Sequence, residues 1–363
     1  MVTIGIDLHK KRSRYTVLSQ DGTVLCKRTL PSSPQSYREV FAPWADGQGR
    51  VAMEATINWY WAVDTLREMG MDVHLANPHK VRLIAESTIK TDDVDSEALA
   101  QLLRMNWLPE SRITPAKVRL LRERLRFRIT LVRTQTAFKC RVHALLDKVG
   151  IKPPEVTDLF GVTGRQWLEQ VELPGEYRLN LDGCLRMLDH LAGQIKDVEK
   201  WLAQKTRVDR DVKLLMGMPG VGRFGASLIL AEIGDIGFFK DKRKLASFVG
   251  VVPGTRNSDI KRRDTGLKKD SNKYVRWLLA EAVTKACKVV PAWARLYQRV
   301  EAGNVRRRPK ARMAVMHKMV LAVWRVLTTK EPFDRLHNCP ELHEQNMASS
   351  LLGTGLKQGR VTD

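Results

Sequence analysis

Four carboxylate side chains in the first third of this 363-residue sequence have the types and spacing of metal ligands. The first two end short apolar runs, TIGID and RVAME, and the last two lie three residues apart in the acidic segment KTDDVDSEAL. Carboxylates can hold two Mg²⁺ ions, which neutralise charge on a scissile phosphodiester and on its attacking and leaving oxygens. We therefore predict a site for phosphodiester cleavage, with Mg²⁺ as its ion and Mn²⁺ as the alternative, at Asp7, Glu54, Asp92 and Asp95.

Each of these carboxylates also has a simpler explanation. Asp92, Asp93 and Asp95 would favour the start of a helix electrostatically, and Glu54 could be a surface residue after a strand. That explanation suffices for any single carboxylate, but it fits the set of four less well. The chain has 62 Lys and Arg against 40 Asp and Glu, so an acidic cluster stands out against its surroundings. We therefore favour the metal site.

The elements that must position these residues are short strands and one helix. TIGID and RVAME have the pattern of strands, and the segments 14–20 and 23–30 flank an Asp-Gly turn and predict a hairpin. Another strand, within 71–78, ends at an Asn-Pro pair. Thr91 can cap a helix whose apolar residues then recur at helical spacing. This order suits an RNase H-like sheet, in which carboxylates meet at one end of the strands.

The middle of the chain has the pattern of long helices. Residues 111–150 carry 11 Lys and Arg against 2 Asp and Glu, so this helix could lie against phosphates, although a solvated helix face is the plainer alternative. Apolar residues in 181–202 repeat every seven positions, which predicts a coiled-coil seam and a partner helix. The phosphate contacts inferred from charge in the first helix are Arg122, Arg124, Arg126 and Arg128.

A third region, 209–332, contains two further signals for nucleic acid. A Pro-Gly-Val-Gly turn lies between two helical stretches, as in a helix-hairpin-helix, and its amides at Gly220 and Gly222 could hold a phosphate. Such a turn is more often purely structural. Residues 256–276 then form a polar loop with 8 Lys and Arg and 3 Asp. The predicted backbone contacts there are Lys261, Arg262, Arg263, Lys268, Lys269 and Arg276.

Overall composition points to a polyanionic partner. The formal net charge is +22, which makes nucleic acid the default ligand. No apolar run is long enough to span a membrane, and the first residues lack a signal-peptide pattern, so we expect a cytoplasmic, nucleoid-associated protein without a membrane partner. The five cysteines are scattered and include no CxxC pair, which argues against a zinc site or a disulfide framework.

Several segments resemble the Piv-like DEDD transposases of bacterial insertion sequences, whose catalytic domain resembles RuvC-type Holliday-junction resolvases. GIDLHK, MEAT, NPHKVRLIAES and KTDDVDSEALA resemble the N-terminal half of that family. GMPGVGRFGASLILAEIGDI, KLASFVGVVPG and KRRDTGLKKDSNKYVRWLLAEA resemble its C-terminal half. The motifs run in the family's order from about residue 3 to about residue 330. The family's acidic positions fall on Asp7, Glu54, Asp92 and Asp95, and its KTDxxD pattern favours Asp92 over Asp93.

The resemblance implies a second catalytic element, a serine nucleophile that links covalently to a DNA phosphate. The matching residue in GVVPGTRNSDI is Ser258, whereas Ser271 aligns better with a family glycine. Many relatives have glycine after this serine, but Asp259 and Ile260 follow it here. On chemistry alone, a lone serine in a basic loop is more often a hydrogen-bonding or phosphate-contacting residue. The resemblance further implies a structured non-coding guide RNA as a partner.

The predicted fold is α/β plus all-α. It comprises an RNase H-like (RuvC-like) catalytic domain in 1–110, a long coiled-coil helical hairpin in 111–208, a mainly helical transposase domain with a helix-hairpin-helix-like motif and the serine loop in 209–332, and a tail in 333–363. We expect a DNA transposase that assembles as a dimer or tetramer through the coiled coil. The alternatives are a Holliday-junction-type structure-specific endonuclease and a non-catalytic nucleic-acid-binding protein.

Overall fold

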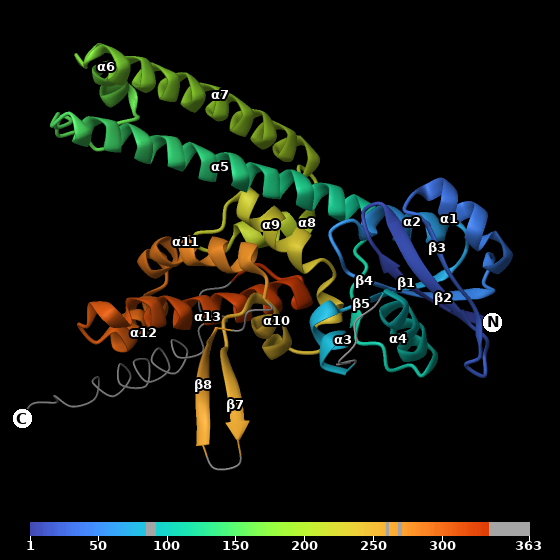
Figure 1. Cartoon of the computed structure of the whole chain (residues 1–363). Helices are drawn as coiled ribbons and strands as arrows, with labels where there is room; N and C mark the ends of the chain where they lie inside the picture. Colours follow the sequence, from blue (N-terminus) through green and yellow to red (C-terminus); the bar gives the residue numbers. More distant parts are fainter. Residues whose placement is uncertain (85–91, 259–260, 268–270, 334–363) are drawn as a thin grey trace, which may run out of the picture. The chain divides into compact units, whose positions relative to one another are not determined.

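The structure is a computed structural model that describes residues 1–84, 92–258, 261–267 and 271–333; for residues 83, 92–94, 253–258 and 261–267 it describes the backbone only. The chain divides into two compact units, Met1–Pro115 and Ala116–Asp363 (Figure 1). Each unit has a hydrophobic core of its own. The four-part division expected from the sequence stays a prediction.

The first unit is built on a mixed six-stranded sheet with the strand order β3-β2-β1-β4-β5-β6. The first three strands form an antiparallel meander, β4 and β5 run parallel to β1, and β6 pairs antiparallel with β5. This order fits the predicted RNase H-like domain. The strands are β1 (Val2–Leu8), β2 (Arg12–Leu18), β3 (Val24–Pro31), β4 (Gly49–Glu54), β5 (Asp72–Ala76) and β6 (Glu110–Ser111).

Helices cover both faces of this sheet because its central strands are apolar on both sides. On one face, Ile4, Ile6 and Met53 pack with buried residues of two helices, α1 and α2. On the other face, Ala52 packs against Leu99 and other residues of α4. The helices of this unit are α1 (Pro34–Phe41), α2 (Trp59–Glu68), α3 (Pro78–Ile84) and α4 (Asp92–Arg104), with a 3₁₀ turn at Ala42–Trp44.

The second unit begins with the predicted pair of long helices, α5 (Ala116–Lys148) and α7 (Gly175–Lys205), with the short α6 (Val162–Gln170) between them (Figure 1). Leu202 of α7 packs with residues 125 and 129 of α5, and Leu181 packs with residues 142–146, so the two helices run antiparallel. The heptad residues of α7 therefore face a helix of the same chain. That the pair supercoils as a coiled coil stays a prediction.

The rest of the second unit is a helical body around α13 (Arg308–Thr329), which contacts four other helices. Val315, Met319 and Val323 of α13 are fully or almost fully buried in its core. Within the described residues, no helix has both the length and the apolar character needed to cross a bilayer. The other helices are α8 (Arg210–Met216), α9 (Arg223–Ile233), α10 (Lys242–Val249), α11 (Lys273–Val289) and α12 (Pro291–Glu301), with 3₁₀ turns at Ile236–Phe238 and Val305–Arg307.

The segment predicted as a polar loop before α11 is instead mostly a two-stranded ribbon. Strands β7 (Pro253–Ser258) and β8 (Lys261–Leu267) pair antiparallel (Figure 1). The prediction of a loop was wrong because these strands are almost entirely polar and lack the apolar alternation that marks a strand in a sequence. The pairing of its backbone defines this ribbon.

Candidate active site

Two of the four predicted carboxylates lie side by side at the end of neighbouring strands. In the parallel pair β1 and β4, Ile6 is in register with Met53, so Asp7 and Glu54 follow at matching positions. Both residues are half-buried, and the Asp7 side chain is only 16% exposed. The sheet therefore places two half-buried carboxylates at the carboxyl ends of its two central strands.

These two residues share a face of the sheet with α4. Side chains alternate along a strand, so Asp7 shares a face with Gly5, and Glu54 with Ala52. A Cβ on Gly5 would lie 1.9 Å from the carbonyl oxygen of Ser96, which shows how closely α4 approaches β1 there. The Ser96 hydroxyl is also buried, 2.9 Å from the hydroxyl of Thr16 on β2.

The direction of α4 brings the other two carboxylates to the same end of the sheet. Its last residue, Arg104, lies against Gly22 in the β2–β3 turn, next to the amino end of β1. Just after α4, Asn106 accepts a hydrogen bond of 3.2 Å from Arg50 at the start of β4. The first turn of α4, which contains Asp92 and Asp95, therefore lies toward the carboxyl ends of β1 and β4. Asp95 is exposed, and the Asp92 side chain is outside the described residues.

The carboxylates at the ends of these strands are suited to bind a hard cation. Carboxylate oxygens are the ligands that Mg²⁺ prefers, and Asp7 and Glu54 supply them from adjacent strands. Among the side chains that the structure describes, no three His, Cys, Asp or Glu residues are grouped closely enough to hold a metal ion. A complete site would therefore need the first turn of α4, including Asp92.

A histidine that the sequence analysis did not select contacts Asp7. His9 Nε2 lies 3.0 Å from Asp7 Oδ2, and the Asn58 side-chain amide donates to the His9 carbonyl oxygen over 3.4 Å. The Thr56 hydroxyl in turn donates to Asn58 Oδ1 over 2.9 Å. The loops that follow β1 and β4 are thus joined beside the carboxylates. The only signal in the sequence was the position of His9 two residues after Asp7 in GIDLHK.

The close approach of α4 to β1 makes Gly5 a sensitive position. In Gly5→Ala the new methyl group would collide with backbone atoms of Ser96 and Ala100, which cannot rotate away. We expect the free energy of unfolding to fall by about 2 kcal/mol or more, measured by urea denaturation of the whole chain. The matched control is Gly193→Ala in the interior of α7, where a Cβ meets nothing within 4 Å. That change should stabilise slightly, because alanine favours a helix over glycine. An unchanged midpoint for Gly5→Ala would contradict the packing described.

The predicted nucleophile, Ser258, is the last residue of β7 and is in register with Lys261 on β8. Of the neighbouring basic residues, Arg262 and Arg263 belong to β8, whereas Lys268 and Lys269 lie outside the described residues. Arg276, in the first turn of α11, donates from Nη1 to the Ser271 hydroxyl over 2.8 Å. Ser271 therefore has a structural partner at the start of α11.

The arginines predicted to grip phosphates along α5 mostly bind other parts of the protein. Arg122 donates twice to the carbonyl oxygen of Ala231, at 3.1 and 2.8 Å, and Arg126 makes two hydrogen bonds, of 2.8 and 2.9 Å, with the Glu232 carboxylate. Arg128 pairs with Glu199 and stacks 4.1 Å from the centre of the Phe224 ring. Arg124 lies within about 6 Å of two aromatic rings, Phe127 and Trp201. Three of these four arginines are thus engaged within the protein, which the net charge of the helix does not reveal.

Glu232 is the centre of this pairing. Its side chain is 1% exposed, and besides Arg126 it accepts a 2.7 Å hydrogen bond from Asn272, the residue that caps α11. The carboxylate thereby joins α5, α9 and the start of α11. We expect Glu232→Ala to lower the free energy of unfolding by about 3–5 kcal/mol, because it leaves two half-buried arginines without their counter-charge.

Glu199→Ala is the matched control for that change in a urea melt. Its carboxylate pairs with Arg128 but is 49% exposed, so its loss should cost no more than about 1 kcal/mol. Equal effects of the two substitutions would show that the buried network contributes nothing beyond a surface ion pair.

The two glycines of the predicted phosphate-binding turn differ in their surroundings. Gly220 has a φ of +82°, and a Cβ there would lie 2.7 Å from the carbonyl oxygen of Ala282 in α11. Packing and backbone conformation therefore explain that glycine. Gly222 precedes the first residue of α9, and a Cβ on it would meet nothing within 4 Å. The turn joins α8 to α9 as expected, but that it forms a helix-hairpin-helix and binds phosphate stays a prediction.

The strand order and the adjacent positions of Asp7 and Glu54 fit an RNase H-like domain followed by a helical region. A family model described as "Transposase", of the DEDD type of IS110 elements, matches residues 4–151. A second model, "Transposase IS116/IS110/IS902 family", matches residues 212–298. Together the two models match more than half of the chain, which belongs to the IS110/IS116 family of transposases.

Curated relatives are similar over most of their length. A "Probable family 20 transposase" of Pseudomonas aeruginosa is 27% identical, over 90% of this chain and 96% of the relative. The "Transposase for insertion sequence element IS1111A" of Coxiella burnetii is 27% identical over 91% and 90%. Among solved structures, Thermus thermophilus RuvC in complex with a Holliday junction substrate is similar, at 17% identity over 31% of this chain and 99% of that one. Its TM-score is 0.23, so our assignment of the fold rests on the strand order.

Proposed function

We propose that the protein is the DNA transposase of an insertion sequence, which cuts and rejoins DNA strands. The observation that carries this proposal is the pair of carboxylates at the ends of β1 and β4, with the first turn of α4 directed to the same end of the sheet. This arrangement occurs in a chain of a transposase family that carries a formal net charge of +22. The carboxylates would bind a metal ion, and the positive charge of the rest of the protein would bind a polyanion.

In this proposal Asp7, Glu54, Asp92 and Asp95 hold Mg²⁺, with Mn²⁺ as a substitute. When bound, the metal would neutralise charge on the scissile phosphate and lower the pKa of an attacking hydroxyl. The contribution of the chain is to fix the ligands. Two come from rigid neighbouring strands, and two come from a helix whose position is set by its contact with Gly5. His9 positions Asp7 by contacting one of its oxygens.

Ser258 is the proposed nucleophile. Its Oγ would form a bond to the phosphorus while the bond from phosphorus to the leaving sugar oxygen breaks, and the hydroxyl proton is transferred away as that sugar oxygen takes one up. The phosphoserine–DNA link keeps a phosphodiester for rejoining, which water would otherwise destroy. Ser258 is at the end of a polar two-stranded ribbon, a position suited to reaching a DNA backbone.

For contacts to the DNA backbone we propose the basic residues around that ribbon and a reduced set elsewhere. Arg122, Arg126 and Arg128 are engaged within the protein, so of the α5 arginines we retain only Arg124. Gly222 remains a candidate for phosphate binding at the amino end of α9, in the manner of a helix-hairpin-helix. The proposed set is Arg124, Gly222, Lys261, Arg262, Arg263, Lys268, Lys269 and Arg276.

We also propose a structured non-coding guide RNA as a partner and assembly as a dimer or tetramer. Recombination needs two duplexes held together, which a symmetric assembly provides. The heptad residues of α7 pack on α5 within one chain, so an assembly through the coiled coil would use the outer faces of these two helices.

The test is a cleavage assay with labelled DNA that carries the junction of the element's ends, together with RNA transcribed from its flanks. In Mg²⁺ we expect cut strands and DNA linked to protein, and in EDTA neither product. Cut strands without linked protein would favour the structure-specific endonuclease. Binding with no cutting in Mg²⁺ or Mn²⁺ would favour a non-catalytic nucleic-acid-binding protein.

A further inference from the structure

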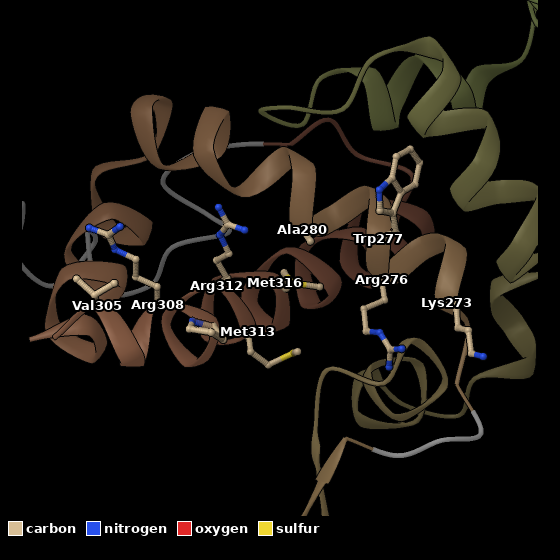
Figure 2. Close-up of a pocket in the computed structure, with 10 residues that line it drawn as sticks. Lys273, Arg276, Trp277, Ala280, Val305, Arg308, Arg312, Met313 and Met316 are labelled. Carbon is tan, nitrogen blue, oxygen red and sulfur yellow. The ribbon is translucent and has the colours of Figure 1, made fainter. Parts of the chain in front are cut away.

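A cavity of about 630 Å³ lies between α11 and α13, and among its lining residues Arg276 also belongs to the proposed DNA contacts. Figure 2 shows basic side chains from both helices around it, together with methionines of α13. Ligand sites in proteins commonly enclose about 300–1,000 Å³, so this cavity has the size of a small-molecule or nucleotide site. The residues that decide its chemistry are Lys273, Arg276, Arg308, Arg312, Met313 and Met316.

The charges around the cavity select an anion. The described lining residues include four cationic and no anionic side chains. Arg308 donates from Nε to Glu301 over 2.7 Å, and Arg276 donates from Nη1 to Ser271 over 2.8 Å. Each of these two guanidinium groups is thus held in place by a hydrogen bond to another residue. Guanidinium N–H groups are donors of the type that binds phosphate oxygens.

The apolar part of the lining selects a flat, uncharged body attached to that anion. Ala280, Met313 and Met316 contribute apolar surface, and methionine sulfur makes favourable contacts with aromatic rings. A nucleotide combines a planar base with a phosphate. A paired base cannot enter such a cavity, because stacking and pairing keep it inside the duplex. The geometry therefore fits one unpaired nucleotide.

The neighbourhood of the cavity indicates which strand would supply it. A Cβ on Gly250 would lie 2.9 Å from Arg276 Nη1, so Arg276 is at the base of the β7–β8 ribbon. Ser258 is at the far end of β7, five residues or roughly 17 Å from the first residue of that strand, Pro253. Arg312 also lines a second cavity of about 350 Å³ together with Tyr297.

We infer that the cavity between α11 and α13 binds an unpaired nucleotide of the DNA strand on which Ser258 acts. This inference rests on the proposed function for the identity of the strand. It adds to that function a contact that only a locally unpaired strand can make. A base held here would fix the position of the strand along the ribbon.

Fluorescence anisotropy with labelled oligonucleotides tests this inference in EDTA, where neither the metal site nor Ser258 can act. Ala280→Phe fills the cavity without changing charge, and Arg312→Gln removes one cation from its rim. For a single DNA strand we expect Ala280→Phe to weaken binding about tenfold and to leave the salt dependence unchanged. Arg312→Gln should instead reduce the slope of log K against log salt by about 0.7. The control is Arg306→Gln, an exposed arginine just before α13 that does not line the cavity.

Comparison of strands and variants separates the outcomes. A thermal melt first checks that Ala280→Phe is folded. The inference is supported if this variant binds single-stranded DNA more weakly than the wild type does, but binds the duplex of the same sequence equally well. It is overturned if the affinities for single strand and duplex both equal those of the wild type, if both fall equally, or if only the affinity for an RNA strand of that sequence falls. Because this assay measures binding and not cleavage, its result would stand if the proposed catalysis failed. Failure of binding in the cavity would likewise leave the proposed catalysis untouched.

Discussion

Asp7→Asn should reduce DNA cleavage in Mg²⁺ by roughly a thousandfold or more, since it removes a negative charge where a metal ion would supply several kcal/mol of transition-state stabilisation. Asparagine has the shape of aspartate and can still contact His9, so the fold of the first unit should persist. The measurement is the initial rate of strand cutting, with circular dichroism and a thermal melt on the same preparation.

Asp72→Asn provides the control for the loss of charge. Asp72 starts β5, at the opposite end of the strands from Asp7, and its side chain is 61% exposed. Its substitution should leave the cleavage rate within about twofold, as expected for a surface position away from a site. A folded Asp7→Asn variant that cuts DNA at the wild-type rate would remove the acidic site from the mechanism.

Ser258→Ala should abolish the covalent protein–DNA product altogether, because no other atom of that side chain can attack phosphorus. DNA binding should be unchanged, since the substitution alters no charge. A denaturing gel with end-labelled DNA measures the linked product, and anisotropy on the same samples measures binding.

Ser271→Ala is the natural comparison for this variant. Ser271 is the other serine near the ribbon, and its hydroxyl accepts a hydrogen bond from Arg276 at the start of α11. It should still form the covalent product, with at most a modest loss of stability. If Ser258→Ala forms the product and Ser271→Ala does not, the nucleophile has been assigned to the wrong serine.

The strands that carry Asp7 and Glu54 could be predicted from the sequence because each is a short apolar run ending in a carboxylate. The helix that begins at Asp92 was indicated in the same way by its apolar spacing. The orientation of α4 was beyond the reach of these patterns. It depends on the fit of Ser96 over Gly5, a contact between residues 91 positions apart that leaves no periodic signal.

The internal roles of charged residues were also hidden from sequence reasoning. The run of arginines in α5 suggested a surface for phosphates, but Arg126 is satisfied by Glu232, 106 residues away. Similarly, the heptads of α7 indicated a partner helix without showing that α5 of the same chain fills that place. Charge and periodicity indicate that a helix face has a partner, whereas only the fold shows which residues that partner supplies.

The proposed acidic site is consistent with the overall basic character of the chain. Positive charge attracts and holds the polyanion, but the reacting phosphate needs metal ions, and metal ions need carboxylates. The two requirements fall on different parts of the chain here, with the carboxylates in the first unit and the proposed serine in the second.

Mass spectrometry of the covalent product, after digestion with nuclease and trypsin, tests whether Ser258 forms the link to DNA. Cleavage after Arg256 and Lys261 releases the peptide NSDIK, in which Ser258 is the only hydroxyl residue. We predict that this peptide carries a nucleotide phosphate in reactions with Mg²⁺, and that it is unmodified in EDTA or in Asp7→Asn. Cut DNA with an unmodified NSDIK peptide and no other protein-linked nucleotide would contradict serine-mediated recombination and make the protein a nuclease that cuts without joining.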